Sequence, residues 1–333
     1  MICLKENIKI LIVGANGFLG AHLLRYFEEK GASIVAVDIS LPEFDSSKYS
    51  DRVKWCKVDI LQDDLSDYLQ RVDVVYHLAG KYLPGNSAQV LNELCTLNVE
   101  GTKRVLKASV NAGVKCFIHI SSAAVCGRID GGVIKEEDIM PNESYGLSKL
   151  RSEDVVKEIC NNKMEYVIVR PTAFFGENHL GSLYEMVRAI KHKRYCIIGD
   201  GENHMNFLYV RDLVEILVEL ANNFDSYNQT FLVADRPIAL KDFTNLTRKE
   251  LGLKPTSLYM PKLIGLLIGG GFDLVSKLLR RSMPLSLKRV ANMTNDCRYD
   301  GSKILEKLSL KLPYGVEKGW SKTIEWYKSN DLL

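Results

Sequence analysis

The sequence lacks an excess of either charge, a leader-like start and any internal repeat. Its 333 residues carry 44 Lys and Arg against 41 Asp and Glu, and the net charge of +3 gives no reason to expect a nucleic-acid partner. The first residues, Met1–Asn7, become charged before any apolar segment develops, so we expect no signal peptide. Hydrophobic residues make up 46% of the chain and can fill a sizeable core, which predicts a globular protein of the cytoplasm.

Cysteine and histidine show no ligand-like grouping. None of the eight cysteines stands in a Cys-x-x-Cys pair, and several lie in strand-like runs. We therefore expect reduced core thiols, not disulfides or metal ligands. The six histidines show no metal-ligand spacing either, and His77 and His119 lie in strand-like runs where they are expected to be buried. No metal site is predicted.

No apolar run is long enough to span a membrane. The longest uninterrupted apolar stretch, Leu263–Phe272, has about half of the ~20 residues that a spanning helix needs. It belongs to segment 258–281, which ends in basic residues, among them Lys277 and Arg281. Two interpretations remain open. The segment forms a buried helix pair over a substrate pocket, or it lies at the inner face of a membrane with its basic end near anionic headgroups.

The chain opens with a glycine-rich turn between an apolar run and a helical pattern. The run Ile8–Val13 is followed by Gly14-Ala-Asn-Gly17-Phe-Leu-Gly20 and then by regularly spaced apolar residues. This order is typical of a dinucleotide-binding βαβ unit. Gly14 allows the tight turn, Gly17 lets the backbone approach a diphosphate at the helix N-terminus, and Gly20 permits close packing of helix on strand.

An acidic residue follows the second predicted strand. The apolar run Ser33–Val37 ends directly before Asp38. A carboxylate at this position accepts hydrogen bonds from a ribose 2′-hydroxyl and repels a 2′-phosphate. The combination of glycines, strand, helix and Asp38 therefore predicts NAD as the cofactor, in preference to NADP.

Further strands and helices alternate along the first half of the chain. Strands are expected at 53–58, 72–77, 116–120 and 166–170, with one helix over 86–113 and another around Tyr145. This alternation predicts an α/β fold, a Rossmann-type doubly wound parallel sheet with a smaller C-terminal α/β substrate-binding part. The expected NAD-binding domain is 1–170 plus about 205–235, with a returning strand at 229–233. The substrate-binding part is about 171–204 and 236–333.

Three side chains have the chemistry to remove a proton from an alcohol. Tyr145 and Lys149, four residues apart, share one helix face. A neighbouring ammonium favours the phenolate, so we expect Lys149 to lower the pKa of Tyr145 from its ordinary ~10 and make it a general base. The hydroxyl of Ser122, just after a predicted strand, is expected to hold the reacting oxygen of the substrate.

These motifs resemble those of an extended short-chain dehydrogenase/reductase of the NAD-dependent epimerase/dehydratase group. The matching pieces occur in family order over about two hundred residues: Gly14-x-x-Gly17-x-x-Gly20, Asp38, Asp59-Ile60, His77-Leu-Ala-Gly80, Asn98-Val-Glu-Gly-Thr102, Ser121–Gly127, Tyr145-x-x-x-Lys149, Arg170-Pro171 and Asn206–Asp212. One departure is Cys126, where family members usually carry Tyr. The resemblance also implies a homodimer formed through a four-helix bundle.

The resemblance implies roles for residues in both halves of the chain. The cofactor contacts it implies are Gly14, Asn16, Gly17, Phe18, Leu19, Gly20, Asp38, Asp59, Ile60, Leu78, Ala79, Gly80, Asn98, Ser121, Tyr145, Lys149 and Pro171. The catalytic residues it implies are Ser122, Tyr145 and Lys149. The candidate substrate contacts are Ser122, Thr172, Glu177, Asn178, Met205 and Arg281.

The substrate end departs from the usual nucleotide-sugar pattern. Nucleotide-sugar members usually carry Arg where this chain has Met205. The pattern of segment 258–281 is similar to that of a bacterial subgroup whose members are 4-epimerases of N-acetylhexosamine on polyprenyl diphosphate. The resemblance therefore leaves both a nucleotide and a lipid open as the carrier of a sugar-diphosphate substrate.

The expected reaction is 4-epimerisation of a diphosphate-linked sugar. Tyr145 takes the proton of the C4 hydroxyl while NAD takes the C4 hydride, and the hydride returns to the opposite face of the 4-keto sugar. Three alternatives remain. An NAD-dependent 3β-hydroxysteroid or sterol dehydrogenase would release NADH. A 4,6-dehydratase is disfavoured, because Ala123 and Ala124 stand where those enzymes carry an acidic pair. The third is a non-catalytic NAD-binding protein.

Overall fold

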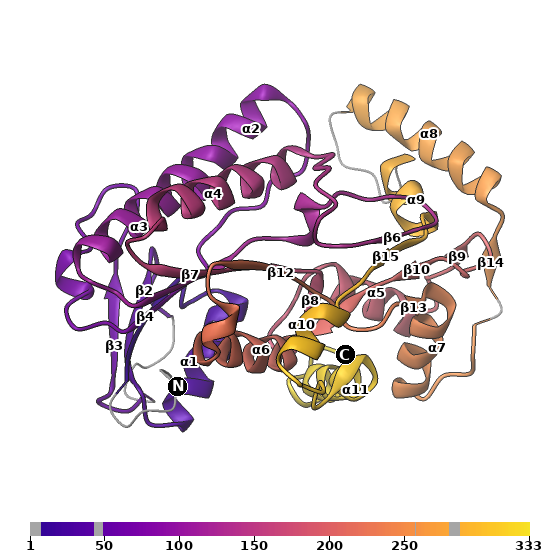
Figure 1. Cartoon of the computed structure of the whole chain (residues 1–333). Coiled ribbons are helices and arrows are strands. Elements are labelled where there is room, and N and C mark those ends of the chain that lie inside the picture. Colours follow the sequence, from indigo (N-terminus) through magenta and orange to yellow (C-terminus); the bar gives the residue numbers. More distant parts are fainter. Residues whose placement is uncertain (1–7, 43–48, 257, 280–286) are drawn as a thin grey trace.

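A seven-stranded parallel sheet forms the centre of the molecule (Figure 1). The computed structural model describes residues 8–42, 49–256, 258–279 and 287–333. The strands of the sheet are β1 (Lys9–Val13), β2 (Ser33–Asp38), β3 (Val53–Lys57), β4 (Val74–His77), β5 (Cys116–Ile120), β7 (Glu165–Pro171) and β12 (Gln229–Val233). Their order is β12-β7-β5-β4-β1-β2-β3, with every neighbouring pair parallel. The predicted doubly wound parallel sheet is confirmed.

Helices cover both faces of this sheet because its strands are apolar on both sides. The helices on one face are α2 (Ala88–Cys95), α3 (Thr102–Asn111) and α4 (Ser144–Cys160), and those on the other are α1 (Phe18–Glu29) and α6 (Val210–Asn222) (Figure 1). Successive strand residues alternate between the two layers. In β1, Ile10 and Ile12 belong to one buried cluster, whereas Leu11 and Val13 belong to the other.

The predicted helix over 86–113 is interrupted. Ser87 caps the start of α2 by accepting a hydrogen bond from the backbone N–H of Val90 at 3.2 Å. A wider, π-helical turn over Thr96–Gly101 then separates α2 from α3. This turn buries Asn98 completely. Such turns recur at functional sites, and the periodicity of apolar residues does not reveal them.

The rest of the chain forms a smaller layer of helices and two-stranded sheets. Its helices are α5 (Ser182–Lys191), α7 (Leu240–Glu250), α8 (Lys262–Leu279), α9 (Leu287–Thr294), α10 (Ser302–Lys307) and α11 (Gly315–Ser329). Its strand pairs are β6 (Gly132–Ile134) with β15 (Cys297–Tyr299), β8 (Ala173–Phe175) with β11 (Phe207–Tyr209), β9 (Ile197–Ile198) with β14 (Tyr259–Met260), and β10 (His204–Met205) with β13 (Ile238–Ala239). The division into two domains stays a prediction. None of the seven cysteines in the described part of the chain forms a disulfide.

The apolar segment after residue 258 is a helix with an exposed face. Helix α8 packs its glycine side on β9 and α9, since a Cβ at Gly265 would lie 2.8 Å from Ile198 and 3.6 Å from Val290. On the other side, Leu263 is 76% exposed and Leu267 is 78% exposed. The interpretation as a buried helix pair is therefore wrong for this face, although the helix pair itself exists. Within the described ranges, no helix combines the length and apolar character needed to cross a membrane.

Candidate active site

The glycine-rich turn connects the ends of three strands. The backbone N–H groups of Gly14 and Ala15 donate to the carbonyl of Val37 at 2.8 and 3.1 Å, which joins the turn to the end of β2. Gly14 has a φ of +88°, and a Cβ there would lie 2.8 Å from the backbone N of Ala79, after β4. A Cβ at Gly20 would lie 2.2 Å from the carbonyl O of Gly14. Both positions therefore require glycine, as the sequence pattern indicates.

Asp38 stands where the second strand ends. One carboxylate oxygen accepts a hydrogen bond from the N–H of Asn16 at 3.0 Å, and the other accepts one from the N–H of Ser40 at 3.1 Å. The Asn16 side chain also donates to the Ser40 hydroxyl at 3.1 Å. The carboxylate thus orders the turn and remains part of the cleft wall.

A cleft of about 220 Å³ opens between these strand ends. Eight of the predicted cofactor residues line it: Gly14, Gly17, Asp38, Asp59, Ile60, Leu78, Ala79 and Gly80. Five apolar lining residues were not predicted: Val13, Val37, Ile39, Val58 and Leu97. Four of these five lie next to the end of a strand, and this position in the sequence could have identified them as residues of the cleft wall. They provide apolar walls suited to a flat aromatic ring.

Other predicted cofactor residues lie outside the cleft lining. Phe18 stacks its ring on Phe174 at 5.7 Å, and Leu19 is buried in the core beneath the sheet. Pro171 ends β7, where it pairs with Val233. For these residues, cofactor contact remains a prediction.

Gly80 connects the cleft to helix α4. A side chain at this position would lie 3.4 Å from Asn98 Oδ1 and 3.4 Å from Lys149 Nζ. Asn98 Oδ1 accepts the backbone N–H of Lys81 at 2.7 Å, and its Nδ2 donates to the Ser148 hydroxyl at 3.0 Å. The buried Asn98 therefore joins the strand end after β4 to the turn of α4 that carries Tyr145 and Lys149.

The three predicted catalytic side chains gather at the same end of the sheet. Tyr145 lies in the first turn of α4, and its hydroxyl is hydrogen-bonded to Ser122, which follows β5. The Ser122 oxygen also accepts the N–H of Ala124 at 3.2 Å. A Cβ at Gly146 would lie 2.3 Å from the Ala124 carbonyl O, so α4 approaches this turn as closely as a glycine permits. Ser122 and Tyr145 are therefore fixed across a tight contact.

Burial shifts the pKa values of Tyr145 and Lys149 in the directions that favour the neutral form of each side chain. Desolvation raises the pKa of Tyr145, the hydrogen bond with Ser122 opposes that rise, and nearby Tyr82 adds to it. Desolvation lowers the pKa of Lys149 to about 8, against the opposing influence of Glu153. The sequence argument expected Lys149 to lower the pKa of Tyr145. In the structure burial dominates, so a further positive charge beside the phenol is needed to favour the phenolate.

Two buried histidines support the site without carrying charge. His77 Nε2 lies 2.9 Å from the Thr102 hydroxyl, and His119 Nε2 lies 3.0 Å from the Ser152 hydroxyl. Burial lowers the pKa of His77 to about 3 and that of His119 well below its ordinary value. Both rings are therefore neutral near pH 7. In the described part of the chain, no group of three or more His, Cys, Asp or Glu side chains is arranged to hold a metal ion.

An aromatic residue beside Tyr145 was missed in the sequence. The ring of Tyr82 meets the ring of Tyr145 edge to face at 5.1 Å between centroids, and Tyr82 is 59% exposed. Tyr82 lies in the irregular loop after β4. No motif or period singles out a lone tyrosine in such a loop, so this contact could only be found in three dimensions.

The candidate substrate contacts have different surroundings. Both Glu177 oxygens accept hydrogen bonds from the Tyr209 hydroxyl, at 3.0 and 2.9 Å, and Arg211 pairs with Glu177 at 2.7 Å. The carboxylate therefore already has internal partners. Thr172 Oγ1 is buried and has no hydrogen-bond partner in the described part of the chain. Contact of Thr172 with substrate stays a prediction.

The remaining substrate candidates are Asn178, Met205 and Arg281. Asn178 adopts a φ of +71°, a backbone conformation that asparagine tolerates better than most residues. Met205 is half-buried in β10, where it pairs with Ile238. Arg281 lies outside the described residues. Substrate contact by all three stays a prediction.

Comparison with protein families gives one extensive match. Residues 10–234 match the model of the NAD dependent epimerase/dehydratase family. This stretch includes the glycine-rich turn, the cleft and all three candidate catalytic side chains.

Two characterised relatives resemble nearly the whole chain. The N-acetyl-α-D-glucosaminyl-diphospho-ditrans,octacis-undecaprenol 4-epimerase of Escherichia coli O157:H7 is 26% identical over 326 residues, covering 96% of this chain and 95% of the relative. The UDP-glucose 4-epimerase of Vibrio cholerae is 26% identical over 334 residues, with 96% of each covered.

A solved structure shares the fold over almost its full length. The UDP-glucuronic acid 4-epimerase from Bacillus cereus, in complex with NAD, superposes with a TM-score of 0.76 at 21% identity. The match covers 97% of this chain and 99% of that one.

Proposed function

We propose a function from one premise: this chain belongs to the NAD-dependent epimerase/dehydratase family, whose model matches residues 10–234. Within that family it is an NAD-dependent sugar 4-epimerase, in line with its two 4-epimerase relatives. The observation that carries the proposal is the hydrogen-bonded Ser122–Tyr145 pair with Lys149 at the end of a glycine-walled cleft.

The cleft residues fit NAD. Gly14 has no side chain that could obstruct the turn before α1, and the N-terminus of that helix favours a diphosphate. The Asp38 carboxylate at the cleft wall is an acceptor for ribose hydroxyls. When bound, NAD supplies the hydride acceptor, and later the donor, for C4 of the sugar.

The protein side chains manage the proton and the orientation. Tyr145 accepts the proton of the C4 hydroxyl, and the Ser122 hydroxyl donates a hydrogen bond to the reacting oxygen as negative charge develops on it. Lys149, beside Gly80 at the cleft edge, is a donor for the cofactor ribose. Its ammonium does not lower the pKa of Tyr145 in the cofactor-free protein, so it would favour the phenolate only in the assembled complex. After the keto sugar turns over, the same phenol returns the proton.

The first experiment follows the sugar and the cofactor together. Purified protein is incubated with UDP-N-acetylglucosamine and, separately, with its polyprenyl diphosphate counterpart. A C4 epimer is expected to form without net absorbance at 340 nm, because the hydride returns to the sugar in each cycle. Stoichiometric accumulation of NADH with a keto product would instead identify a dehydrogenase.

We propose the lipid-linked sugar as the preferred substrate. Half-buried Met205 offers no charge to a nucleotide diphosphate at the position where nucleotide-sugar members usually carry Arg. The exposed apolar face of α8 is the second support, because it provides a surface for a lipid carrier or the membrane that contains it. Faster turnover of the UDP-sugar than of the polyprenyl conjugate would contradict this choice.

We further propose that the exposed face of α8, formed by Leu263, Ile264, Leu267 and Ile268, rests on an anionic membrane surface. Segment 258–289 carries six Lys or Arg and one Asp, so its net charge is +5. The whole chain has a net charge of +3, so the remainder is −2. The part of the sequence that contains the apolar face is therefore basic, which suits anionic headgroups.

Vesicle sedimentation tests this contact. The double variant Leu263→Ser/Leu267→Ser should lose binding to vesicles that contain phosphatidylglycerol and keep its activity on the water-soluble UDP-sugar. Phe224→Ser is the matched control, because Phe224 is 60% exposed but lies after α6. Equal vesicle binding by wild type, double variant and control would rule out the α8 face.

The oligomeric state is a separate proposal. The family resemblance supports a homodimer, and light scattering on the purified chain would give a mass of about twice 37.6 kDa if it is correct. A monomer mass at micromolar concentration would contradict it.

A further inference from the structure

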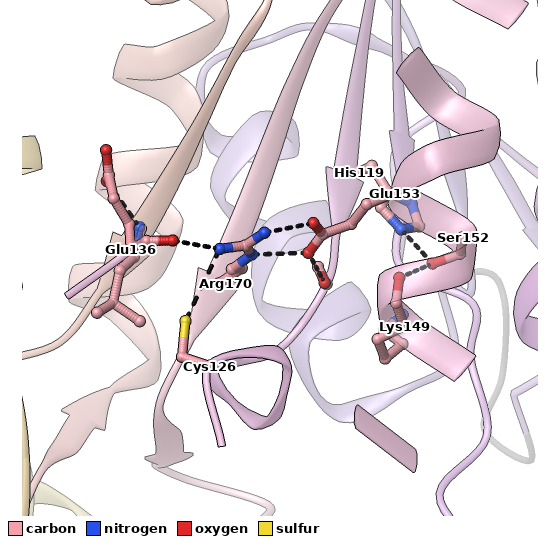
Figure 2. A network of polar contacts seen from close by, with 9 residues as sticks. His119, Cys126, Glu136, Lys149, Ser152, Glu153 and Arg170 are labelled. Atoms are coloured by element: carbon pink, nitrogen blue, oxygen red, sulfur yellow. Dashed lines mark hydrogen bonds and ion pairs between the residues drawn. The ribbon is translucent and has the colours of Figure 1, made fainter. Parts of the chain in front are cut away.

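A buried ion pair between Arg170 and Glu153 joins β7 to α4, the helix that also carries Lys149 (Figure 2). Arg170, on β7, donates from Nε to one oxygen of Glu153 at 2.8 Å and from Nη2 to the other at 2.6 Å. Glu153 lies on α4, four residues after Lys149, and is completely buried. Arg170 also donates to the carbonyl of Glu136 at 2.7 Å. This two-pronged geometry fixes the carboxylate plane as well as its position.

A third donor to this carboxylate comes from the residue that precedes Ser122. The Ser121 hydroxyl donates to Glu153 at 2.5 Å, and Ser121 is buried. Ser121 directly precedes Ser122 in the chain, and its backbone N–H bonds to the carbonyl of Val169 at 2.7 Å. The backbone that presents Ser122 is thus held by β7 through its N–H and by α4 through a side chain.

We propose that Glu153 is a positioning residue: its carboxylate, oriented by Arg170, holds Ser121 and so fixes the Ser122 hydroxyl against Tyr145 on the same helix. Glu153 touches neither substrate nor cofactor in this role. The inference rests on the proposed function of Ser122 and Tyr145. Buried ion pairs contribute little net stability in most proteins, so a positioning role accounts for the presence of this one.

The neighbouring Ser152 has a parallel role on the same helix. Its hydroxyl donates to the carbonyl of Lys149 at 2.7 Å and contacts His119 Nε2 (Figure 2). Successive residues of α4 therefore connect to β5 and to the segment after it.

The titratable groups around Ser122 and Tyr145 come from several elements. They are Lys149 and Glu153 on α4, His119 on β5, His77 on β4, Arg170 on β7, Tyr82 in the loop after β4, and Cys126 in the turn after Ser122.

Two double variants isolate the hydrogen bond to Ser121. Removing one partner of the ion pair would leave a buried charge and risk unfolding, so both charges are removed together. Glu153→Gln/Arg170→Met keeps an oxygen acceptor for Ser121, whereas Glu153→Leu/Arg170→Met does not. Both variants lose the contact to Glu136 equally. They therefore differ at position 153 alone, where Gln offers Ser121 an oxygen acceptor and Leu does not.

The kinetic readout uses the NAD-loaded enzyme and the sugar that wild type converts. The Leu-containing variant should lose ~10- to 100-fold in kcat with little change in KM, because misplacing a catalytic group slows chemistry more than binding. The Gln-containing variant should retain most of the wild-type kcat. Equal kcat values in two variants of similar melting temperature would overturn the proposal. Thr247→Val is the control, since it removes a buried hydrogen bond of 3.0 Å to Trp320 far from the site.

A second readout needs no substrate. In protein labelled with ¹³C at tyrosine Cζ, the resonance absent from Tyr145→Phe belongs to Tyr145, and its titration gives the pKa. Loss of the Ser122 hydrogen bond should raise this pKa by about one unit in the Leu-containing variant alone. An unchanged titration in that variant would refute the positioning role. If wild type converts neither sugar, the proposed function fails, while this titration still decides the role of Glu153.

Discussion

At the scale of single residues, the site combines two groups whose charged forms are disfavoured by burial. Burial raises the pKa of Tyr145 and lowers the pKa of Lys149 to about 8. In the described part of the chain, the group that lowers the pKa of Tyr145 and so favours the phenolate is Ser122, through its hydrogen bond.

Tyr145→Phe tests the general base directly. The ring and its edge-to-face contact with Tyr82 remain, so the fold and NAD binding should be unaffected. Turnover should fall by ~10²–10⁴, the usual contribution of general acid–base catalysis. Steady-state rates of NAD-loaded wild type and variant check this. A folded, NAD-bound variant that keeps more than about a tenth of the wild-type rate would remove Tyr145 from the mechanism.

Lys149→Met tests the cost of the buried ammonium. The pKa of Lys149 is about 8 in the folded protein and 10.5 in the reference state, so the unfolded chain holds the proton more tightly. The residue therefore destabilises the fold below about pH 8, and this penalty fades as the pH rises from 8 toward 10.5. The cofactor-free variant should be more stable at pH 7, by roughly 3 kcal/mol, though inactive.

Denaturant unfolding at pH 7 and pH 10 measures this difference. The stability that Lys149→Met gains over wild type should be smaller at pH 10 than at pH 7. Lys115→Met is the control, because Lys115 pairs with Asp73 at the surface and should give no gain at either pH. A Lys149→Met protein that is less stable than wild type at pH 7 would contradict the argument.

At the scale of elements, the contact between α4 and the turn after β5 aligns the candidate catalytic residues Ser122 and Tyr145. Gly146→Ala would bring a methyl group to 2.3 Å from the Ala124 carbonyl O, a backbone atom that cannot move aside. Helix and turn should separate, with a loss of about 1–3 kcal/mol in stability and at least tenfold in kcat. Gly271→Ala on α8 is the control, because a Cβ there meets nothing within 4 Å. Equal kcat values for the two variants would show that the close approach is dispensable.

The elements differ in how far the sequence could predict them. The strands and the glycine turn follow from local apolar runs and backbone requirements, and both are present as predicted. The Glu153–Arg170 pair joins residues from separate elements, and the Tyr82–Tyr145 contact depends on the path of a loop. Neither has a local signature. The exposed face of α8 was hidden for another reason: its composition is equally apolar whether the helix is buried or exposed.

At the scale of the whole molecule, the cleft lies where the order of the strands reverses. From β1 the chain runs outward through β2 to β3, and then returns to β4 on the other side of β1. The loops that leave β1 and β4 therefore lead to helices on opposite faces of the sheet, and the cleft opens beside the close contact of Gly14 with Ala79. A ligand in this cleft meets the ends of several strands and so binds only the assembled sheet, which means that cofactor binding must stabilise the fold as a whole.

Thermal unfolding with NAD or NADP tests this coupling and the role of Asp38. NAD at about a hundred times its dissociation constant should add ~2.7 kcal/mol to stability, whereas NADP should add much less because its 2′-phosphate meets the Asp38 carboxylate. Asp38→Asn keeps an acceptor for the Asn16 N–H but loses the charge, so the difference between the two cofactors should narrow. Asp59→Asn, also in the cleft wall but bonded to the N–H of Leu61, should leave the difference unchanged. Equal stabilisation of wild type by NAD and NADP would show that Asp38 does not select the cofactor.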